Sequence, residues 1–231
     1  MIPQINRYQL NFPDPRDANE DGIVAWGGDL TPSRIIKAYQ NGIFPWYNEG
    51  EPILWWSPDP RLIMELDDFK LSRSLKKSIK KFNYKFDTNF REVITNCGEI
   101  ARVNQDGSSW IQSDIIEAYE NLFGMGIAHS VECYDMENNL VGGLYGLSIG
   151  KVFCGESMFA HKSDASKSAY AILIKHLKKW GYQFVDCQVP TKHLKSLGAK
   201  EVAREYFLNR LEKVYSENLT HFWEIDKELS K

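Results

Sequence analysis

The sequence predicts an α+β protein with two parts, a small N-terminal domain over residues 1–62 and a larger domain over residues 63–231. Three observations lead to this prediction. Eight of the nine prolines lie within the first sixty residues, where they interrupt regular structure. The later sequence alternates helix-like apolar stripes with strand-like runs, and short connections between the strands favour antiparallel pairing. The chain has 231 residues, 43% of them hydrophobic, which is enough to bury one large core.

The N-terminal part is expected to contain one helix. Thr31 can cap this helix, Pro32 suits its first position, and Gly42 follows its last turn. Its apolar face can anchor the small domain on its neighbour. Irregular loops rich in aromatic residues are expected to follow, over 43–47 and 54–61. The N-terminal part is therefore predicted to lack a large core of its own.

The larger domain is expected to begin with helices, to continue with strands, and to return to helices. Its expected helices lie within residues 69–86 and over 89–101, 113–125, 163–180, 192–197 and 204–213, with Ser113 and Ser163 as caps. Its expected strands cover 129–135, 140–150, 151–159 and 183–189. The first three strands are joined by connections short enough for hairpins, so we expect an antiparallel meander.

This element order is that of acyl-CoA N-acetyltransferases: a helix, a three-stranded meander, a helix, a strand and a helix. We therefore expect the larger domain to be acetyltransferase-like (GNAT-like), with a mainly antiparallel sheet flanked by helices. Such enzymes hold the cofactor pyrophosphate on glycine-rich backbone before the long helix. In this chain the corresponding loop, residues 160–168, contains no glycine. The sequence thus predicts the fold without the cofactor cradle.

Composition excludes several classes of protein. The charged fraction of 26% is that of a globular domain, which excludes wholesale disorder. No apolar run is long enough to cross a membrane, and the N-terminus lacks a secretory signal, so we expect a cytoplasmic protein without a membrane anchor. The four cysteines form no CxxC pair, which favours reduced thiols over zinc or disulfides. The net charge of −3, taken alone, argues against binding to nucleic acid.

The charge is unevenly distributed, however. Residues 69–86, here called the basic segment, carry seven basic residues and no acidic residue, so the rest of the chain carries −10. Leu71, Leu75, Ile79 and Phe82 predict a helix there. Its cations could form a solvated helix face, an electrostatic footprint for phosphates, or a membrane-surface helix; the last lacks the apolar face rich in Trp that such helices often use.

Three polar residues on predicted strands are candidates for chemistry. Glu156 lies on an apolar strand. It could pair with a structural Arg or Lys or lie at a solvent-exposed edge of the sheet, or it could be an acid of a functional site. Asp186 and Gln188 are two apart, so alternation places them on one face. They could simply satisfy nearby backbone groups. Alternatively, an Asp that orients a Gln amide can position an amine nucleophile.

The remaining candidates are less specific. The five histidines share no metal-ligand spacing, so no metal site is predicted, and none of the common catalytic motifs occurs. Four tryptophans fall in loop-like contexts: Trp46, Trp55, Trp56 and Trp110. Such residues usually join domains, but beside a basic segment they are also candidates for stacking on a nucleoside.

Ten motifs, in order, resemble those of the leucyl/phenylalanyl-tRNA–protein transferase family. They are GIFPWY (42–47), WWSPDPR (55–61), SRSLKKSIKK (72–81), SWIQ (109–112), AHSVE (128–132), LVGGLYG (140–146), FCGESMF (153–159), ASK (165–167), DCQ (186–188) and SLGA (196–199). WWSPDPR and FCGESMF are the most specific. The resemblance extends from about Phe12 to Leu211.

The resemblance implies a cytoplasmic aminoacyltransferase of the N-degron pathway. Such an enzyme moves leucine, phenylalanine or methionine from aminoacyl-tRNA to the N-terminal Arg or Lys of an acceptor protein, and it uses no ATP, CoA or metal. The fold that it implies is a small N-terminal domain followed by an acetyltransferase-like domain. Nothing in the sequence calls for a second copy, so we expect a monomer.

The resemblance also implies roles for individual residues. Asp186 would polarise Gln188, which assists attack by the acceptor amine, and Glu156 would be an acid of the same pocket. Leu144, Leu173 and Val185 would line the pocket for the aminoacyl side chain, and Trp46 and Trp110 would lie near the terminal adenosine. Five cations would hold the acceptor stem of the tRNA: Arg73, Lys76, Lys77, Lys80 and Lys81.

Two alternatives remain from the sequence, an acyl-CoA-dependent N-acetyltransferase and a non-catalytic tRNA-binding module. The glycine-free loop argues against the first. The sequence leaves open the preference among Leu, Phe and Met, the physiological acceptors, the role of residues 216–231, the oligomeric state, and whether Glu156 acts in catalysis or in acceptor binding.

Overall fold

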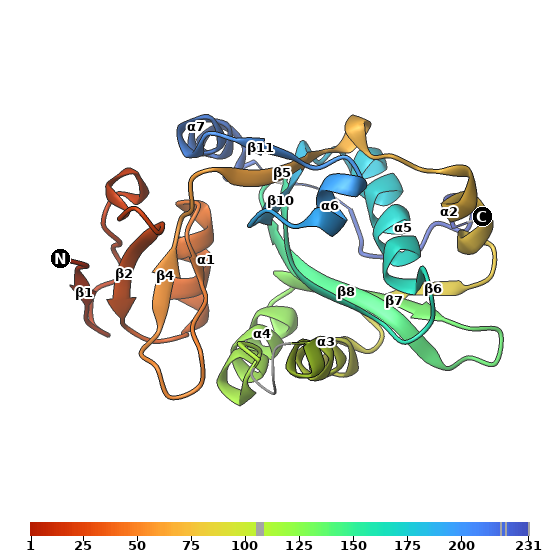
Figure 1. Ribbon diagram of the computed structural model, residues 1–231, viewed down its shortest axis with the longest axis horizontal. Helices are drawn as coiled ribbons and strands as arrows, with labels where there is room; N and C mark the ends of the chain where they lie inside the picture. The colour runs from red at the N-terminus through yellow and green to blue at the C-terminus, as the bar shows by residue number, and fades with distance from the viewer. Residues whose placement is uncertain (105–108, 218, 220, 231) are drawn as a thin grey trace.

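A computed structural model describes residues 1–104, 109–217, 219 and 221–230 and contains two β-sheets (Figure 1). The smaller sheet belongs to the N-terminal part. It consists of β1 (Gln4–Ile5), β2 (Ile23–Gly27), β4 (Leu54–Trp56) and β3 (Phe44–Pro45), in that spatial order. β1 pairs with β2 in parallel, and the other neighbours are antiparallel. A short 3₁₀ turn (Pro15–Asp17) and α1 (Pro32–Gln40) complete this part.

The small sheet corrects the expectation of irregular loops at 43–47 and 54–61. Phe44 and Pro45 pair with Trp56 and Trp55, and β4 pairs in turn with β2. These strands are two or three residues long, too short to leave an alternating pattern in the sequence. They form because partners from distant segments supply the hydrogen bonds. The predicted helix is confirmed as α1, with Pro32 at its first position.

The larger sheet has seven strands in the order β11-β5-β10-β9-β8-β7-β6. The predicted meander is confirmed: β7 (Ala128–Tyr134), β8 (Leu140–Ile149) and β9 (Val152–Ala160) pair antiparallel. β10 (Phe184–Gln188) runs parallel to β9 and antiparallel to β5 (Arg61–Glu65). At the two edges lie β11 (Lys200–Val202) and β6 (Asn83–Phe86). The strands β5, β6 and β11 were not predicted.

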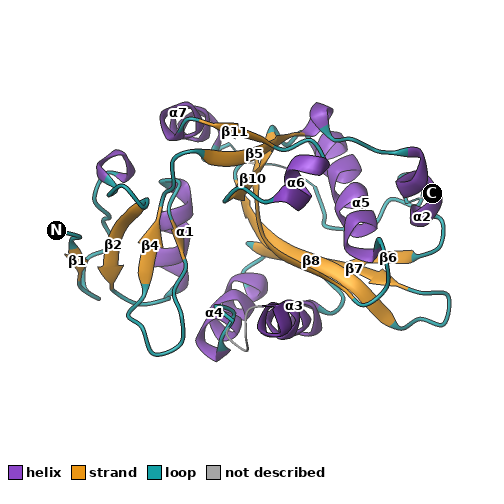
Figure 2. Ribbon diagram, in the orientation of Figure 1, coloured by secondary structure: helices purple, strands orange, loops and turns teal. Residues whose placement is uncertain are grey.

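Helices cover both faces of the larger sheet (Figure 2). α3 (Phe90–Asn104) and α4 (Ser113–Gly124) lie on one face, and α5 (Ala165–Trp180) lies on the other with α6 (Lys192–Ser196). α7 (Arg204–Val214) lies beside β11, close to the N-terminal part. The α+β fold class and the acetyltransferase-like element order are therefore confirmed. Among the helices within the described ranges, none is long and apolar enough to cross a membrane.

The two parts share a hydrophobic core. Ile35 and Trp55 from the N-terminal part belong to the same buried cluster as Tyr145 and Phe207 from the larger part. This agrees with the prediction that the small part lacks a large core of its own. The chain leaves the first sheet after β4 and enters the second at β5, whereas the division after residue 62 stays a prediction.

The helix predicted in the basic segment is shorter than its apolar stripe suggested. α2 covers only Arg73–Ile79, and Ser72 caps it by accepting a hydrogen bond from the Leu75 N–H. The chain then turns into β6, in which Asn83–Phe86 pair with β7. Pairing at the edge of the sheet thus overrides the helical period after Ile79.

Two predicted caps are also corrected. The residue that precedes α4 is Gln112, and the residue that precedes α5 is Asp164, in place of Ser113 and Ser163. Asp164 is held in the left-handed conformation, and its carboxylate accepts a hydrogen bond from the Ser78 hydroxyl at 2.9 Å. That contact ties the start of α5 to α2, which a local reading of the sequence around Ser163 does not predict.

Candidate active site

Glu156 on β9 lies at the centre of a half-buried hydrogen-bond network. The Tyr39 hydroxyl from α1 donates to its Oε1 at 2.7 Å, and the Tyr119 hydroxyl from α4 donates to its Oε2 at 3.1 Å. The side-chain Nε2 of Gln188 also donates to Oε1, at 2.8 Å. The two tyrosine hydroxyls are 2.7 Å apart. The N-terminal part therefore supplies one of the groups that hold Glu156 in place.

The environment of Glu156 changes its acidity. Burial raises its pKa to about 7, because the charged form loses contact with water, and the nearby Asp186 adds to this effect. The three hydrogen bonds from Tyr39, Tyr119 and Gln188 act in the opposite direction. A carboxyl that titrates near neutral pH is typical of functional sites.

Asp186 on β10 is held by Arg61, the first residue of β5. The guanidinium Nε donates to Oδ1 at 2.8 Å and Nη2 donates to Oδ2 at 2.6 Å, and both side chains are buried. The same Oδ1 accepts the backbone N–H of Gln188 at 3.0 Å. Asp186 thus contacts Gln188 through its backbone, whereas the Gln188 side chain turns to Glu156.

Gln188 ends β10 in an unusual backbone conformation. Its φ is +60°, and the pairing of β10 with β5 shifts register between Asp186 and Gln188. The strict alternation behind the sequence prediction therefore fails at this residue, although the structure does bring Gln188, Asp186 and Glu156 together. Because Nε2 donates to Glu156, the amide oxygen of Gln188 is the free end that can accept an N–H group.

An apolar cavity of about 300 Å³ opens beside Glu156 and Gln188. It lies where β9 and β10 separate, and its wall includes two of the predicted pocket residues, Leu144 and Val185. Other side chains of the wall are Phe153, Met158, Tyr170, Cys187, Thr191, His193 and Leu194. The third predicted pocket residue, Leu173, instead lies in the core on α5, where it is fully buried.

A second, smaller cavity of about 180 Å³ contains both predicted tryptophans. Trp46 and Trp110 line it together with Phe44 and Pro45. The Trp46 side chain also packs against Trp56, with ring centroids 5.3 Å apart. Glu156, Gln188 and Val189 line this cavity as well as the apolar one. The two cavities therefore meet at the polar residues of the network.

Sequence reasoning missed three residues of this site: Arg61, Tyr39 and Tyr119. The two tyrosines lie on the apolar faces of α1 and α4, and a local pattern cannot show which partner a buried hydroxyl meets. Arg61 is separated from Asp186 by 125 positions. The sequence did contain a signal for Arg61: an aspartate on an apolar strand, such as Asp186, needs a buried cation or hydrogen-bond donor as its partner.

The five predicted cations lie apart from both cavities. Arg73, Lys76 and Lys77 are on α2, and Lys80 and Lys81 follow it in the turn before β6. All five are exposed. Among the ion pairs between described residues, none involves any of the five cations. Their charges are therefore available to an anionic partner.

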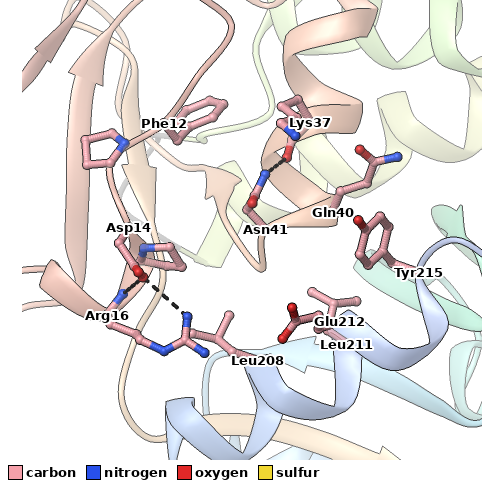
Figure 3. A pocket seen from close by; sticks show the side chains of 12 residues that line it. Phe12, Asp14, Arg16, Lys37, Gln40, Asn41, Leu208, Leu211, Glu212 and Tyr215 are labelled. Carbon is pink, nitrogen blue, oxygen red and sulfur yellow. Dashed lines mark hydrogen bonds and ion pairs between the residues drawn. The ribbon is translucent and has the colours of Figure 1, made fainter.

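A cavity of about 370 Å³ lies elsewhere, between the N-terminal part and α7 (Figure 3). Its wall carries charges of both signs, including Asp14, Arg16, Lys37 and Glu212. It includes none of the predicted site residues. In the described part of the chain, no three His, Cys, Asp or Glu side chains gather closely enough to hold a metal ion.

Two family models match the chain. Residues 63–212 match the family "Leucyl/phenylalanyl-tRNA protein transferase", and residues 28–59 match the N-terminal domain of that family. A protein of Sulfurimonas denitrificans with the name leucyl/phenylalanyl-tRNA--protein transferase is 67% identical over 97% of this chain and 98% of its own length. Proteins of the same name from Maridesulfovibrio salexigens and Flavobacterium johnsoniae are 53% and 51% identical, each over 87% of this chain and over 84% and 95% of their own lengths.

Proposed function

This chain belongs to the leucyl/phenylalanyl-tRNA protein transferase family and is therefore an aminoacyltransferase, and we propose that it joins leucine, phenylalanine or methionine to the N-terminal Arg or Lys of acceptor proteins. The amino acid comes from an aminoacyl-tRNA, and the new peptide bond marks the acceptor for degradation in the cytoplasm. The high-energy aminoacyl ester drives the reaction, so neither ATP nor acyl-CoA enters it.

The observation that carries this proposal is that the apolar cavity and the tryptophan cavity share Glu156, Gln188 and Val189. An aminoacyl-tRNA 3′-end has an apolar side chain and an adenosine, joined through the ester. An apolar side chain in the first cavity and an adenine against Trp46 or Trp110 in the second would bring the ester carbonyl to Gln188. Stacking on aromatic rings suits any base, because every base has a π-face.

The chemistry then requires alignment more than activation. The α-amino nitrogen of the acceptor forms a C–N bond to the ester carbonyl carbon, and the C–O bond to the ribose breaks. A free α-amino group has a pKa of about 7.7–8.0, so a useful fraction is neutral near pH 7. The Gln188 amide oxygen can accept one N–H of this amine and orient its lone pair. The proton released by the amine passes to the departing ribose oxygen, directly or through water.

The apolar cavity also supports the proposed range of substrates. Hydrophobic contacts distinguish side chains by only about 1–3 kcal/mol per methylene. A cavity lined by Leu144, Met158 and Val185 would accept Leu, Phe and Met, because each fills apolar space without a buried charge. Charged side chains would be rejected by the cost of desolvation.

The basic segment supplies the proposed grip on tRNA. Its five exposed cations form no ion pair among the described residues, which favours contact with phosphates. The net charge of −10 on the rest of the chain would discourage non-specific RNA binding and would attract basic acceptor termini.

The decisive experiment mixes the protein with labelled leucyl-tRNA and a peptide that begins with Arg, in the absence of ATP and acyl-CoA. We expect labelled peptide, and we expect none with the same peptide acetylated at its N-terminus, because its nitrogen can no longer attack. Labelling only after addition of acetyl-CoA would favour the N-acetyltransferase alternative. Tight tRNA binding without any turnover would favour a non-catalytic module.

A further inference from the structure

Arg61 is the largest group in contact with the candidate active site that the proposed chemistry does not use. Its side chain is fully buried, and its guanidinium carbon lies over the rings of Phe44 and Phe207, at 4.9 and 4.5 Å from their centroids. Phe44 lines the tryptophan cavity, and Phe207 belongs to α7. Arg61 therefore joins the N-terminal part, α7 and the site.

The guanidinium fixes both carboxylate oxygens of Asp186. Nε and Nη2 donate to Oδ1 and Oδ2 at 2.8 and 2.6 Å, which sets the plane of the carboxylate. The third nitrogen, Nη1, is buried and has no hydrogen-bond partner among the described residues. The two hydrogen bonds from Arg61 leave the Asp186 carboxylate little freedom to rotate.

Asp186 in turn holds the backbone of Gln188. Its Oδ1 accepts the Gln188 N–H at 3.0 Å, and Gln188 has a φ of +60°. A residue with a side chain rarely adopts this left-handed conformation, which is strained and persists only where the surroundings impose it. The hydrogen bond to Asp186 is such a constraint, and it directs the Gln188 side chain toward Glu156.

We propose that Arg61 is a positioning residue for aminoacyl transfer, which acts through Asp186 to hold Gln188 in its left-handed conformation. The inference rests on the proposed function, because it concerns the alignment of the amine by Gln188. Arginine is required for its geometry: a lysine could keep the charge, but it offers a single ammonium in place of the planar fork. The Asp186 carboxylate would then be free to rotate away from the Gln188 N–H.

The test compares Arg61→Lys with a matched control, Arg34→Lys. Arg34 is also fully buried and also pairs with an aspartate, Asp29, at 3.1 Å, but it lies in the N-terminal part without contact to the network. We expect Arg61→Lys to lower kcat by about 10- to 100-fold, with KM for leucyl-tRNA within about twofold of wild type. We expect Arg34→Lys to leave kcat within about twofold.

A double-mutant cycle separates positioning from a general structural role. In a Gln188→Ala background the Arg61→Lys change should cause no further loss of kcat, because the group that it positions is gone. A further loss of the same size, or a rise in KM equal to the fall in kcat, would overturn the inference. A wild-type rate for Arg61→Lys would defeat the inference alone, whereas absence of transfer by the wild-type protein would defeat the proposed function as well.

A second variant covers the case in which Arg61→Lys does not fold. Removal of both charges in Arg61→Met/Asp186→Leu leaves no unpaired buried ion, and such replacements are often neutral for folding. With folding checked by thermal melting, this variant should be as slow as Gln188→Ala, because the Gln188 N–H has lost its acceptor. Transfer at the wild-type rate would overturn the inference.

Discussion

The candidate active site and the basic segment use charge in opposite ways. In the active site Asp186 is buried against Arg61, and the half-buried Glu156 is held by hydroxyl and amide donors. In the basic segment five cations are exposed and form no ion pair among the described residues. Buried groups with fixed partners keep a single geometry, whereas exposed groups without partners can adapt to a flexible polyanion.

This difference assigns separate functions to the two regions. A fixed network suits the chemical step, since alignment of the reacting atoms depends on distances of a few tenths of an ångström. Exposed cations suit capture, since phosphate contacts add affinity without demanding one geometry. We therefore expect changes in the active site to act on kcat and changes in the basic segment to act on tRNA affinity.

The largest effect on transfer is expected from Gln188→Ala. This substitution removes the amide that would orient the amine, so kcat should fall by about 100-fold or more while the Kd for tRNA stays within about twofold. Asp186→Ala should act in the same direction. Steady-state transfer and filter binding measure the two quantities. Gln40→Ala on α1 is the control, since Gln40 lines the remote cavity of Figure 3. Equal losses of kcat and tRNA affinity in Gln188→Ala would contradict the assignment.

The next effect is expected from the basic segment. Replacement of Lys76, Lys77, Lys80 and Lys81 by Gln should weaken binding of every tRNA by about tenfold or more. A plot of log K against the logarithm of the salt concentration should become less steep, and the magnitude of its slope should fall by about three to four. Lys178→Gln/Lys200→Gln is a suitable control, because these lysines already pair with Asp67 and Asp68. An unchanged salt slope in the fourfold variant would show that the tRNA binds elsewhere.

A smaller effect is expected at the apolar cavity. Leu144→Ala enlarges a wall of the cavity, so the ratio of Phe to Leu transfer should rise by about tenfold. The matched change Leu173→Ala removes a core side chain that does not line the cavity. It should cost about 2–5 kcal/mol of stability without a comparable change in the ratio. Competition between the two charged tRNAs measures this ratio, and a shift of equal size in both variants would assign Leu173 to the cavity after all.

The smallest effect on transfer is expected from Glu156→Gln. Glutamine can accept from Tyr39 and Gln188 and donate to Tyr119, so the network is retained and kcat should fall by less than about tenfold, equally for Arg and Lys acceptors. A much larger loss would make Glu156 a proton carrier. A loss confined to one acceptor would make it part of acceptor recognition.

The same variant has a defined effect on stability. Because the folded pKa of Glu156, about 7, lies above the ordinary value of 4.5, the ionised carboxylate destabilises the folded state as pH rises from 4.5 to 7. Glu156→Gln should therefore gain stability relative to wild type across this range, by about 3 kcal/mol at pH 8. Urea unfolding at pH 4 and pH 8 measures the difference. A stability difference that does not change with pH would contradict the raised pKa.

The elements that the sequence predicted well are those with local, repeated signals. The helices α4 and α5 and the meander β7–β9 have apolar periods, terminal glycines and short connections, so their residues alone determine them. The strands β5, β6 and β11 have three to five residues each, and they depend on partners that are distant in the sequence. Local patterns cannot carry that information.

In the candidate site too, local patterns predicted the residues but not the contacts that depend on distant strands. Glu156, Asp186 and Gln188 were predicted because polar side chains on apolar strands stand out. Their contacts were not predicted, because the register shift at Gln188 and the approach of Arg61 arise only when β5 and β10 pair. The family resemblance pointed to the residues, but it did not show that Asp186 binds the backbone of Gln188.

The central claim is that chemistry depends on the buried network and capture on the basic segment. Single-turnover transfer from leucyl-tRNA at saturating protein tests it most directly, because saturation removes the contribution of binding. We predict that the Lys76, Lys77, Lys80 and Lys81 variant transfers at the wild-type rate, whereas Gln188→Ala is slower by about 100-fold. A slow lysine variant beside a Gln188→Ala variant at the wild-type rate would contradict the account.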